Sequence, residues 1–423
     1  MSGSRICWRR ACAGLAMAGM LVGPTVGTAY GDPSPAPTTA SASASPGDTG
    51  FATLDAATSA RLDRALREVM TETSVPGAIV GVWAPGKGSY VRTFGTADKA
   101  TGAPMTTDLL MRIGSETKTF TVTALLELVD QGKIGLDDTI GRYVDDVPNG
   151  DEITLRQLAG MRSGLFNYSE DEDFFKALTS DPERPFTPDE LLNYSFRHPV
   201  QFAPGADFEY SNTNLILLGL VVEEVSGMPL DRYIEENVLD PAGLDRTLFP
   251  TGAEFPRPHA QGYTDQTASG KVENATDWNP SWGWAAGAMI SDLEDLREWA
   301  RVVATGTLLT PETQAERLRT EPTGVAGAGY GLGIFTLHGW VGHNGSLPGY
   351  ESLTVYLPEE RATLVVLLNT DIAHDGEEPS TLFGEAITRI VSPDHVYYLP
   401  PGAGTSPAPS GSGSGSDRGS GSG

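Results

Sequence analysis

Strand-like segments lie near both ends of this 423-residue chain, and helix-like segments fill the long stretch between them. Residues 78–84 and 90–94 predict two strands around the Gly-rich turn 85–88. From about 119 to 325 apolar residues recur mainly at helical spacing, and after Tyr330 short strand patterns return. The simplest fold therefore brings the end strands into one antiparallel sheet covered by terminal helices, with the middle of the chain forming a helical lobe. The other strands are predicted at 332–337, 340–343, 352–357 and 363–368, and the other helices at 54–69, 215–225, 293–303 and 380–391.

From their composition, the two ends of the chain are not expected to belong to this fold. Arg5, Arg9 and Arg10 precede a mostly apolar stretch of small residues, which is typical of a secretory signal over residues 1–31, cleaved near Gly31. A membrane helix is the alternative, but the apolar run is short and contains Gly and Pro. We expect a secreted, extracellular protein that leaves the membrane after cleavage. It would have a linker over 32–50, one folded domain over 51–398 and a disordered Gly/Ser/Pro tail over 399–423.

Composition disfavours several classes of function. Both cysteines, Cys7 and Cys12, lie in the predicted signal, so the mature chain is expected to have neither a disulfide nor a catalytic cysteine. With 29 Lys and Arg against 55 Asp and Glu, the net charge is −26, and nucleic-acid binding requires a basic face instead. The six histidines form no His-Glu-x-x-His pair and there is no Gly-x-Ser-x-Gly elbow, which disfavours a zinc hydrolase and an ordinary α/β-hydrolase. No metal site is therefore predicted.

The first candidate site is Ser115 with Lys118, at the start of an apolar helical pattern that ends at Gly132. Residues three apart on a helix share one face, so the two side chains are expected to meet. A hydroxyl there lies near the free N–H groups and positive end of the helix, and a lysine drawn out of water loses its proton more easily. This is the arrangement of a serine nucleophile with its own activator. The alternative is that Ser115 only caps the helix.

Two further polar motifs follow in the chain. Tyr210-Ser211-Asn212 stands just before the helix predicted at 215–225, where a loop can project a phenol and an amide into a cleft. The alternative is a helix cap by Ser211 or Asn212 with Tyr210 in the core. His343-Asn344-Gly345-Ser346 ends a predicted strand, and its glycine lets a substrate approach the backbone closely. The alternative is an ordinary polar strand end followed by a turn.

Together, in this order and spacing, the three motifs resemble the signature of the serine beta-lactamase and penicillin-binding superfamily. Within it the chain is most similar to secreted D-alanyl-D-alanine carboxypeptidases of actinomycete type, which have Tyr-Ser-Asn and a histidine in the third motif. Residues 125–136, 154–165 and 282–292 also look like that family. The resemblance implies an α/β (α+β) fold with a five-stranded antiparallel sheet flanked by helices, plus a helical lobe inserted at about 119–325.

The resemblance also implies roles for the motif residues. Ser115 would attack a carbonyl and become acylated, while Lys118 takes or shares its proton and Tyr210 acts as general base and acid. A protonated His343 is one possible source of positive charge beside Tyr210. The backbone N–H groups of Ser115 and Ser346 would form the oxyanion hole. Substrate contacts are expected from Asn212, Trp282, His343, Asn344, Gly345 and Ser346. For Trp282, a purely core position is the equal alternative.

Two departures from the carboxypeptidase pattern affect the expected substrate. Asn344 stands where those enzymes usually have threonine, and residues 332–337 carry no arginine to hold a terminal carboxylate. Arg162 and Arg257 are the remaining candidates for that task. A carboxypeptidase acting on cell-wall peptides leads the hypotheses, with beta-lactams as covalent inhibitors, no cofactor and a monomeric state. The alternatives are an esterase, a D-amino-acid amidase or peptidase, a class C-like beta-lactamase and, more distantly, a non-catalytic penicillin-binding module.

Overall fold

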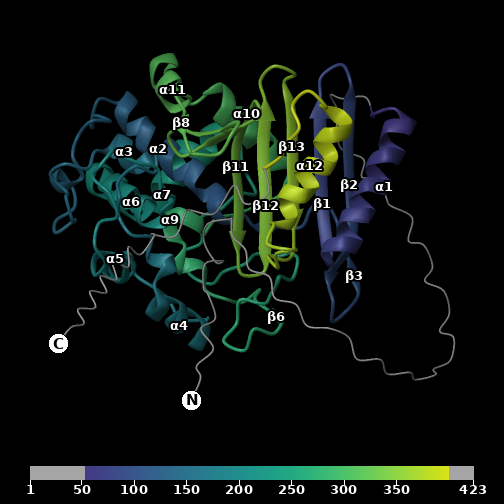
Figure 1. The fold of residues 1–423 in the computed structure, drawn as a ribbon, viewed down its shortest axis with the longest axis horizontal. Coiled ribbons are helices and arrows are strands. Elements are labelled where there is room, and N and C mark those ends of the chain that lie inside the picture. The colour runs from purple at the N-terminus through teal and green to yellow at the C-terminus, as the bar shows by residue number, and fades with distance from the viewer. Residues whose placement is uncertain (1–52, 400–423) are drawn as a thin grey trace, which may run out of the picture.

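The computed structural model describes residues 53–399, so the predicted signal, the linker and all of the predicted tail except Leu399 lie outside the described residues. One antiparallel sheet runs through the molecule in the order β3-β2-β1-β13-β12-β11-β10-β9-β8 (Figure 1). The predicted fold class is confirmed, but the expected five strands are nine. Five are long: β1 (Gly77–Ala84), β2 (Gly88–Asp98), β11 (Trp340–Leu347), β12 (Tyr350–Leu357) and β13 (Ala362–Leu368). Four are short: β3 (Ala103–Pro104), β8 (Glu321–Pro322), β9 (Ala328–Tyr330) and β10 (Phe335–Leu337).

The sheet is buried on both faces, which explains the near-continuous apolar runs of its long strands. Ile79 and Trp83 of β1 belong to the core on the side of α10 (Leu293–Thr305). Alternate residues such as Val80 pack on the opposite face, against α1 (Ala56–Thr73) and α12 (Pro379–Val391). Figure 1 shows α1 and α12 lying across the same face of the sheet. The sheet is therefore the middle layer of three.

The helical lobe lies to one side of the sheet (Figure 1). Its centre is α2 (Thr117–Asp130), which packs against α6 (Asn212–Ser226) and α9 (Trp284–Gly287). Of the helices predicted in the stretch 119–325, α10 packs on the sheet, against β13, β12 and β1. The other lobe helices are α3 (Leu155–Ala159), α4 (Glu172–Ser180), α5 (Pro188–Phe196), α7 (Leu230–Ile234), α8 (Asp240–Ala242) and α11 (Pro311–Arg317).

Short elements link the lobe to the sheet. The 3₁₀ helix η1 (Gly114–Glu116) precedes α2 and lies against β11. The remaining elements are the strands β4 (Met111–Arg112), β5 (Tyr263–Thr264), β6 (Glu273–Asn274) and β7 (Ile290–Ser291). To these are added the 3₁₀ helices η2 (Ile140–Arg142), η3 (Tyr168–Glu170) and η5 (Pro280–Trp282), and the π-helical turn η4 (Glu235–Leu239).

Among the described residues, no helix is by itself long and apolar enough to cross a membrane. One pair of helices, α6 and the segment Leu230–Ala242, is together long and apolar enough by length and composition alone, but it is bent by 78°.

The contact between α2 and α10 is expected to carry much of the stability of the lobe. Phe120 is fully buried, and its ring stacks on Trp299 with centroids 4.0 Å apart. Phe120→Ala removes this contact and leaves a cavity, so we expect the free energy of unfolding to fall by about 3–5 kcal/mol. Urea denaturation followed by circular dichroism measures the change. Val272→Ala is the control, because Val272 is 53% exposed and its truncation should cost less than about 0.5 kcal/mol. Equal midpoints for the two variants would contradict the prediction.

Candidate active site

Ser115 lies in η1, the 3₁₀ helix that directly precedes the regular helix α2. The helix is preceded by Glu116, and neither Ile113 before η1 nor Glu116 before α2 makes a side-chain capping hydrogen bond. Ser115 is half-buried, whereas the residues around it in η1 and α2 are fully buried. The capping alternative therefore does not describe Ser115, and its hydroxyl is available for another partner.

That partner is Lys118, whose side chain has no exposed surface. Its Nζ donates to Ser115 Oγ at 2.8 Å and to the backbone carbonyl of Ala286 at 2.8 Å. The same ammonium group lies over the ring of Tyr210, 4.9 Å from the centroid. The structure thus brings Ser115, Lys118 and Tyr210 together from the start of α2 and the segment before α6, as the sequence predicts.

The loop at 166–170 positions Asn212, the first residue of α6. Its backbone N–H donates to Asn167 Oδ1 at 3.0 Å, and its Nδ2 donates to Ser169 Oγ at 3.0 Å. Ser211 precedes the helix without a side-chain capping bond, so the second capping alternative is not observed either. Asn167 and Ser169 were missed by the sequence reasoning, although they lie only a few residues after the family-like stretch 154–165.

Two glycines allow η1 to touch the strand β11. A Cβ on Gly345 would lie 1.9 Å from the carbonyl oxygen of Ile113, and one on Gly114 would lie 2.8 Å from the backbone nitrogen of Ser346. Gly114 also has φ +51°, a left-handed conformation that favours glycine. This close approach brings Ser115 and Ser346 to one pocket, as an oxyanion hole made of their N–H groups would require.

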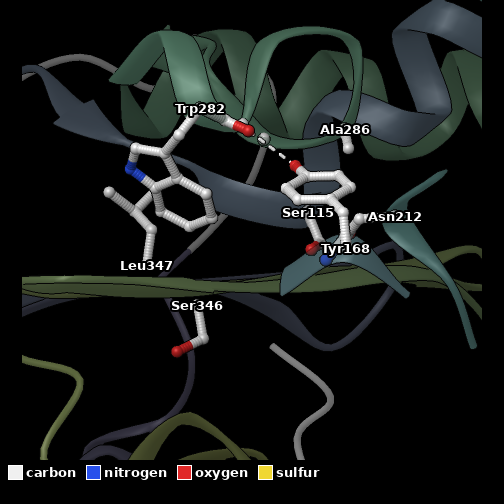
Figure 2. A pocket seen from close by; sticks show the side chains of 9 residues that line it. Ser115, Tyr168, Asn212, Trp282, Ala286, Ser346 and Leu347 are labelled. Atoms are coloured by element: carbon white, nitrogen blue, oxygen red, sulfur yellow. Dashed lines mark hydrogen bonds between the residues drawn. The ribbon is translucent and has the colours of Figure 1, made fainter. Parts of the chain in front are cut away.

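The pocket between lobe and sheet holds about 270 Å³ of space, partly open to solvent. Trp282 forms one wall, and Tyr168 donates its hydroxyl to the Trp282 carbonyl at 2.5 Å (Figure 2). Trp282 is 7% exposed, so it belongs to both the core and the pocket, which the sequence treated as alternatives. The residues that line the pocket are Ser115, Tyr168, Asn212, Trp282, Gly283, Ala286, Gly287, Ser346 and Leu347.

The third motif divides between the two faces of the sheet because side chains alternate along β11. Figure 2 shows Leu347 pointing toward Trp282 and Ser346 pointing away from the pocket. The motif lies inside the strand, which continues to Leu347, and not at its end as predicted. Asn344 donates its Nδ2 to Glu378 Oε2 at 2.8 Å, next to the start of α12, and does not line the pocket. The expected substrate contact from the Asn344 side chain is therefore corrected.

His343 is also away from the pocket surface, in a buried cluster of aromatic rings. It is 2% exposed, and its ring centroid is 6.2 Å from that of Tyr210, 6.0 Å from that of Tyr330 and 5.5 Å from that of Phe335. Burial, helped by the nearby charge of Lys118, lowers the pKa of His343 to about 3. The imidazole is thus neutral near pH 7, and the suggestion of a protonated His343 is corrected.

The carboxyl group of Glu116 lies directly after the nucleophile in the chain and is fully buried. Burial raises the pKa of Glu116 to about 8, and the nearby hydroxyl groups of Ser352 and Thr354 oppose the shift. A neutral Glu116 adds no negative charge beside Ser115 near pH 7. Among residues 53–399, no group of three or more His, Cys, Asp or Glu residues is arranged to hold a metal ion.

The profile of one family, described as Beta-lactamase, matches residues 62–382 of this chain. The chain belongs to the beta-lactamase family. Members of this family are thus expected to have the motifs of Ser115, Tyr210 and His343 in this order, and to bring them together between sheet and lobe. Solved structures that are similar to this chain agree with the observed fold.

Several relatives are similar over most of this chain. A D-stereospecific amidohydrolase from Streptomyces is 29% identical with a TM-score of 0.71, covering 79% of this chain and 99% of that one. A D-amino acid amidase from Ochrobactrum anthropi is 28% identical with a TM-score of 0.68, covering 78% of this chain and 97% of that one. Esterase EstB from Burkholderia gladioli is 29% identical, covering 67% of this chain and 81% of EstB. Protein flp from Staphylococcus aureus is 28% identical over 73% of this chain, which spans only 62% of flp.

The geometry predicts that Ser115 is the residue acylated in a covalent intermediate. Ser115→Ala should abolish labelling by a penicillin or by a nitrophenyl ester and reduce kcat by more than about a thousandfold, because no other group replaces the nucleophile. Intact-protein mass spectrometry measures the adduct.

Ser211→Ala is the matched control for this change. The Ser211 hydroxyl is buried and has no hydrogen-bond partner among the described residues, so its loss should leave labelling intact. An adduct of wild-type yield on the Ser115 variant would assign the nucleophile elsewhere.

Proposed function

We propose that this protein is a serine hydrolase of amides and esters whose leaving group carries no carboxylate, with D-amino-acid amides as the leading substrates. Ser115 Oγ attacks the substrate carbonyl, and its proton passes to the Lys118–Tyr210 pair. The N–H groups of Ser115 and Ser346 stabilise the oxyanion, and Tyr210 returns the proton to the leaving amine. A water activated by Tyr210 then hydrolyses the acyl-enzyme.

The observation that carries this proposal is that, among residues 53–399, no lysine or arginine lines the pocket or lies on the strand before the histidine motif. Phe335, on the strand before the histidine motif, packs against His343, and burial keeps that imidazole neutral. Neither lysine nor arginine is among the residues that line the pocket. Arg162 donates to the carbonyl of Pro322 at 2.8 Å, and Arg257 is exposed on a loop.

The similar proteins support the same choice. The two neighbours with the TM-scores given above are described as a D-stereospecific amidohydrolase and a D-amino acid amidase, and EstB is described as an esterase. The walls formed by Tyr168, Trp282 and Leu347 suit an apolar acyl group. These walls and the relatives favour small amides and esters over a cell-wall peptide.

D-alanyl-D-alanine carboxypeptidase is the second candidate, favoured by Tyr210-Ser211-Asn212 together with His343-x-Gly345. Secretion and covalent inhibition by beta-lactams are proposed with either candidate. A penicillin-binding protein homologue from Pyrococcus abyssi, 27% identical, is described as octameric, so the expected monomeric state stays a prediction for this chain. The intact pairing of Ser115 with Lys118 disfavours a purely non-catalytic module.

A matched pair of peptides tests the leaving-group proposal. An acyl-D-Ala-D-Ala peptide with a free C-terminal carboxylate and the same peptide with a C-terminal amide differ only in the charge that an arginine would recognise. We expect kcat/KM for the amidated peptide to equal or exceed that for the free acid, because a buried partner for the carboxylate would otherwise be worth about tenfold or more. D- and L-phenylalanine amide, compared in the same assay, report stereochemical preference. A free acid preferred by a hundredfold would establish the carboxypeptidase instead.

Gly287 offers a direct test of the acyl side of the pocket. It lines the hollow, and a Cβ there would contact only the Gly114 backbone, at 3.9 Å or more. Gly287→Ala therefore adds one methyl group without disturbing the fold. We expect it to lower kcat/KM for D-phenylalanine amide relative to D-alanine amide by about 10-fold or more.

Gly135→Ala is the control for Gly287→Ala. Gly135 follows the far end of α2, and a Cβ there would meet the carboxylate of Asp138 at an ordinary 3.5 Å. The ratio of the two substrates should not change in this variant. An unchanged ratio in Gly287→Ala as well would show that acyl groups bind elsewhere.

A further inference from the structure

A hydrogen bond between two buried side chains lies directly behind Tyr210. Tyr330, on β9, is 4% exposed, and its hydroxyl is 3.1 Å from His343 Nε2. The other ring nitrogen of His343, Nδ1, is 2.5 Å from the backbone carbonyl oxygen of Asn344. A carbonyl oxygen can only accept, so Nδ1 must carry a proton. In a neutral imidazole Nε2 is then the acceptor, and Tyr330 must be the donor.

The surroundings of His343 keep the imidazole neutral. Lys118 faces it from α2, and its charge adds to burial in lowering the pKa of His343 to about 3. Tyr210 approaches from the segment before α6, Tyr330 from β9 and the apolar ring of Phe335 from β10. On β12, the residue paired with His343 is the uncharged Thr354. Burial also holds the pKa of Tyr330 well above its usual range, so its phenol remains a donor.

The turn that follows Tyr330 packs closely against α2, the helix that carries Lys118, and so fixes the position of Tyr330. A Cβ on Gly333 would lie 2.6 Å from Val122 Cγ2 and 3.2 Å from the Lys118 carbonyl oxygen, and one on Gly331 would lie 2.3 Å from the Arg317 carbonyl oxygen. The Leu332 N–H donates to that same Arg317 carbonyl at 3.1 Å. The turn can approach α2 and α11 this closely only because Gly331 and Gly333 lack side chains.

Arg317 is a second buried cation that interacts electrostatically with Tyr330. Its guanidinium is 1% exposed and donates to Thr123 Oγ1 at 2.8 Å and to the Thr119 carbonyl at 3.0 Å, both on α2. Its charge opposes the rise in the pKa of Tyr330. Arg317 thus acts on Tyr330, whereas burial and the charge of Lys118 disfavour a positive charge on the His343 imidazole.

We propose that Tyr330 is a positioning residue of the catalytic site, whose O–H bond to Nε2 holds His343 as a neutral imidazole protonated on Nδ1. Held in this way, the ring packs beside Tyr210, and Lys118 supplies the positive charge that Tyr210 experiences. His343 then neither exchanges protons with substrate nor binds its leaving group. This inference rests on the proposed function for the roles of Tyr210 and Lys118, but the state of His343 can be measured without a substrate.

The variant Tyr330→Phe tests the proposal because it keeps the ring and removes the donor. Loss of the donor removes a bond that favours the neutral imidazole, so the pKa of His343 should rise. The acid limb of the kcat/KM profile should then move to higher pH. At pH 7, where the imidazole stays neutral, we expect kcat/KM to fall about tenfold because the His343 ring is no longer held beside Tyr210; this is equivalent to about 1.4 kcal/mol of transition-state stabilisation.

Tyr90→Phe is the matched control. Tyr90 is 1% exposed, its hydroxyl donates to Asp63 at 2.7 Å, and β2 is separated from β11 by β1, β13 and β12. This variant also removes the hydrogen-bonded hydroxyl of a buried tyrosine, so it reports any general effect of destabilisation. Its pH profile should match that of the wild type.

Nitrogen-15 NMR of labelled histidine gives a readout that a merely structural role would not move. The His343 signals, assigned by their loss in His343→Gln, should show a protonated Nδ1 and an unprotonated Nε2 from pH 5 to 9. In Tyr330→Phe the Nε2 signal should shift and titrate at higher pH. A proton on Nε2 in the wild type, titration between pH 5 and 9, or an unchanged pH profile in Tyr330→Phe would each overturn the proposal. Failure to hydrolyse the proposed amides would overturn the proposed function and leave the NMR result standing.

Discussion

The buried ammonium group of Lys118 is the interaction on which the arrangement of the site depends. A charge removed from water requires close polar partners, and two of them are Ser115 Oγ and the Ala286 carbonyl. The segment that supplies Ala286 is itself tied to α2, because Thr121 donates to the Ala285 carbonyl and the Met289 N–H donates to Thr117 Oγ1. Ser115, Lys118 and the wall of the pocket are therefore held by one set of hydrogen bonds around the first turns of α2.

The strand β11 provides the second constraint, since its two faces have different tasks. Gly345 and Leu347 face η1 and the pocket, whereas Asn344 faces α12 and bonds to Glu378. On that far face Glu351 accepts a hydrogen bond from the Ser380 N–H, and burial together with the neighbouring Glu378 holds the pKa of Glu351 well above its usual range. A protonated carboxyl group there can remain buried without a cation. The bond between Asn344 and Glu378 thus ties β11 to the start of α12 from behind.

The sequence was sufficient to predict the long helices and strands, because apolar periodicity can be read without knowing any contact. It was also sufficient to predict that Ser115, Lys118 and Tyr210 meet, because this rests on the order of the motifs in the chain. It was insufficient for β3, β8 and β9, since strands of two or three residues carry no detectable alternation. The strand predicted at 332–337 is observed only over its last three residues, as β10. The direction of Asn344 depends on the register of β11, and the charge of His343 depends on burial, which linear spacing does not report. Tyr168 was missed because it lies in the three-residue 3₁₀ helix η3, which has no detectable sequence pattern, and it is held by its bond to the Trp282 carbonyl.

These features together bear on how the proposed enzyme would choose its substrate. A carboxylate entering beside Phe335 would lose its hydration, which costs several kcal/mol, and would meet a neutral His343 in place of a cation. The net charge of −26 also disfavours the approach of an anion from solution. An uncharged amide or ester loses far less hydration, and its acyl group gains contact with Trp282 and Leu347. Selection by shape and apolar contact, with the charge of Lys118 reserved for the chemical step, is therefore the arrangement that this site favours.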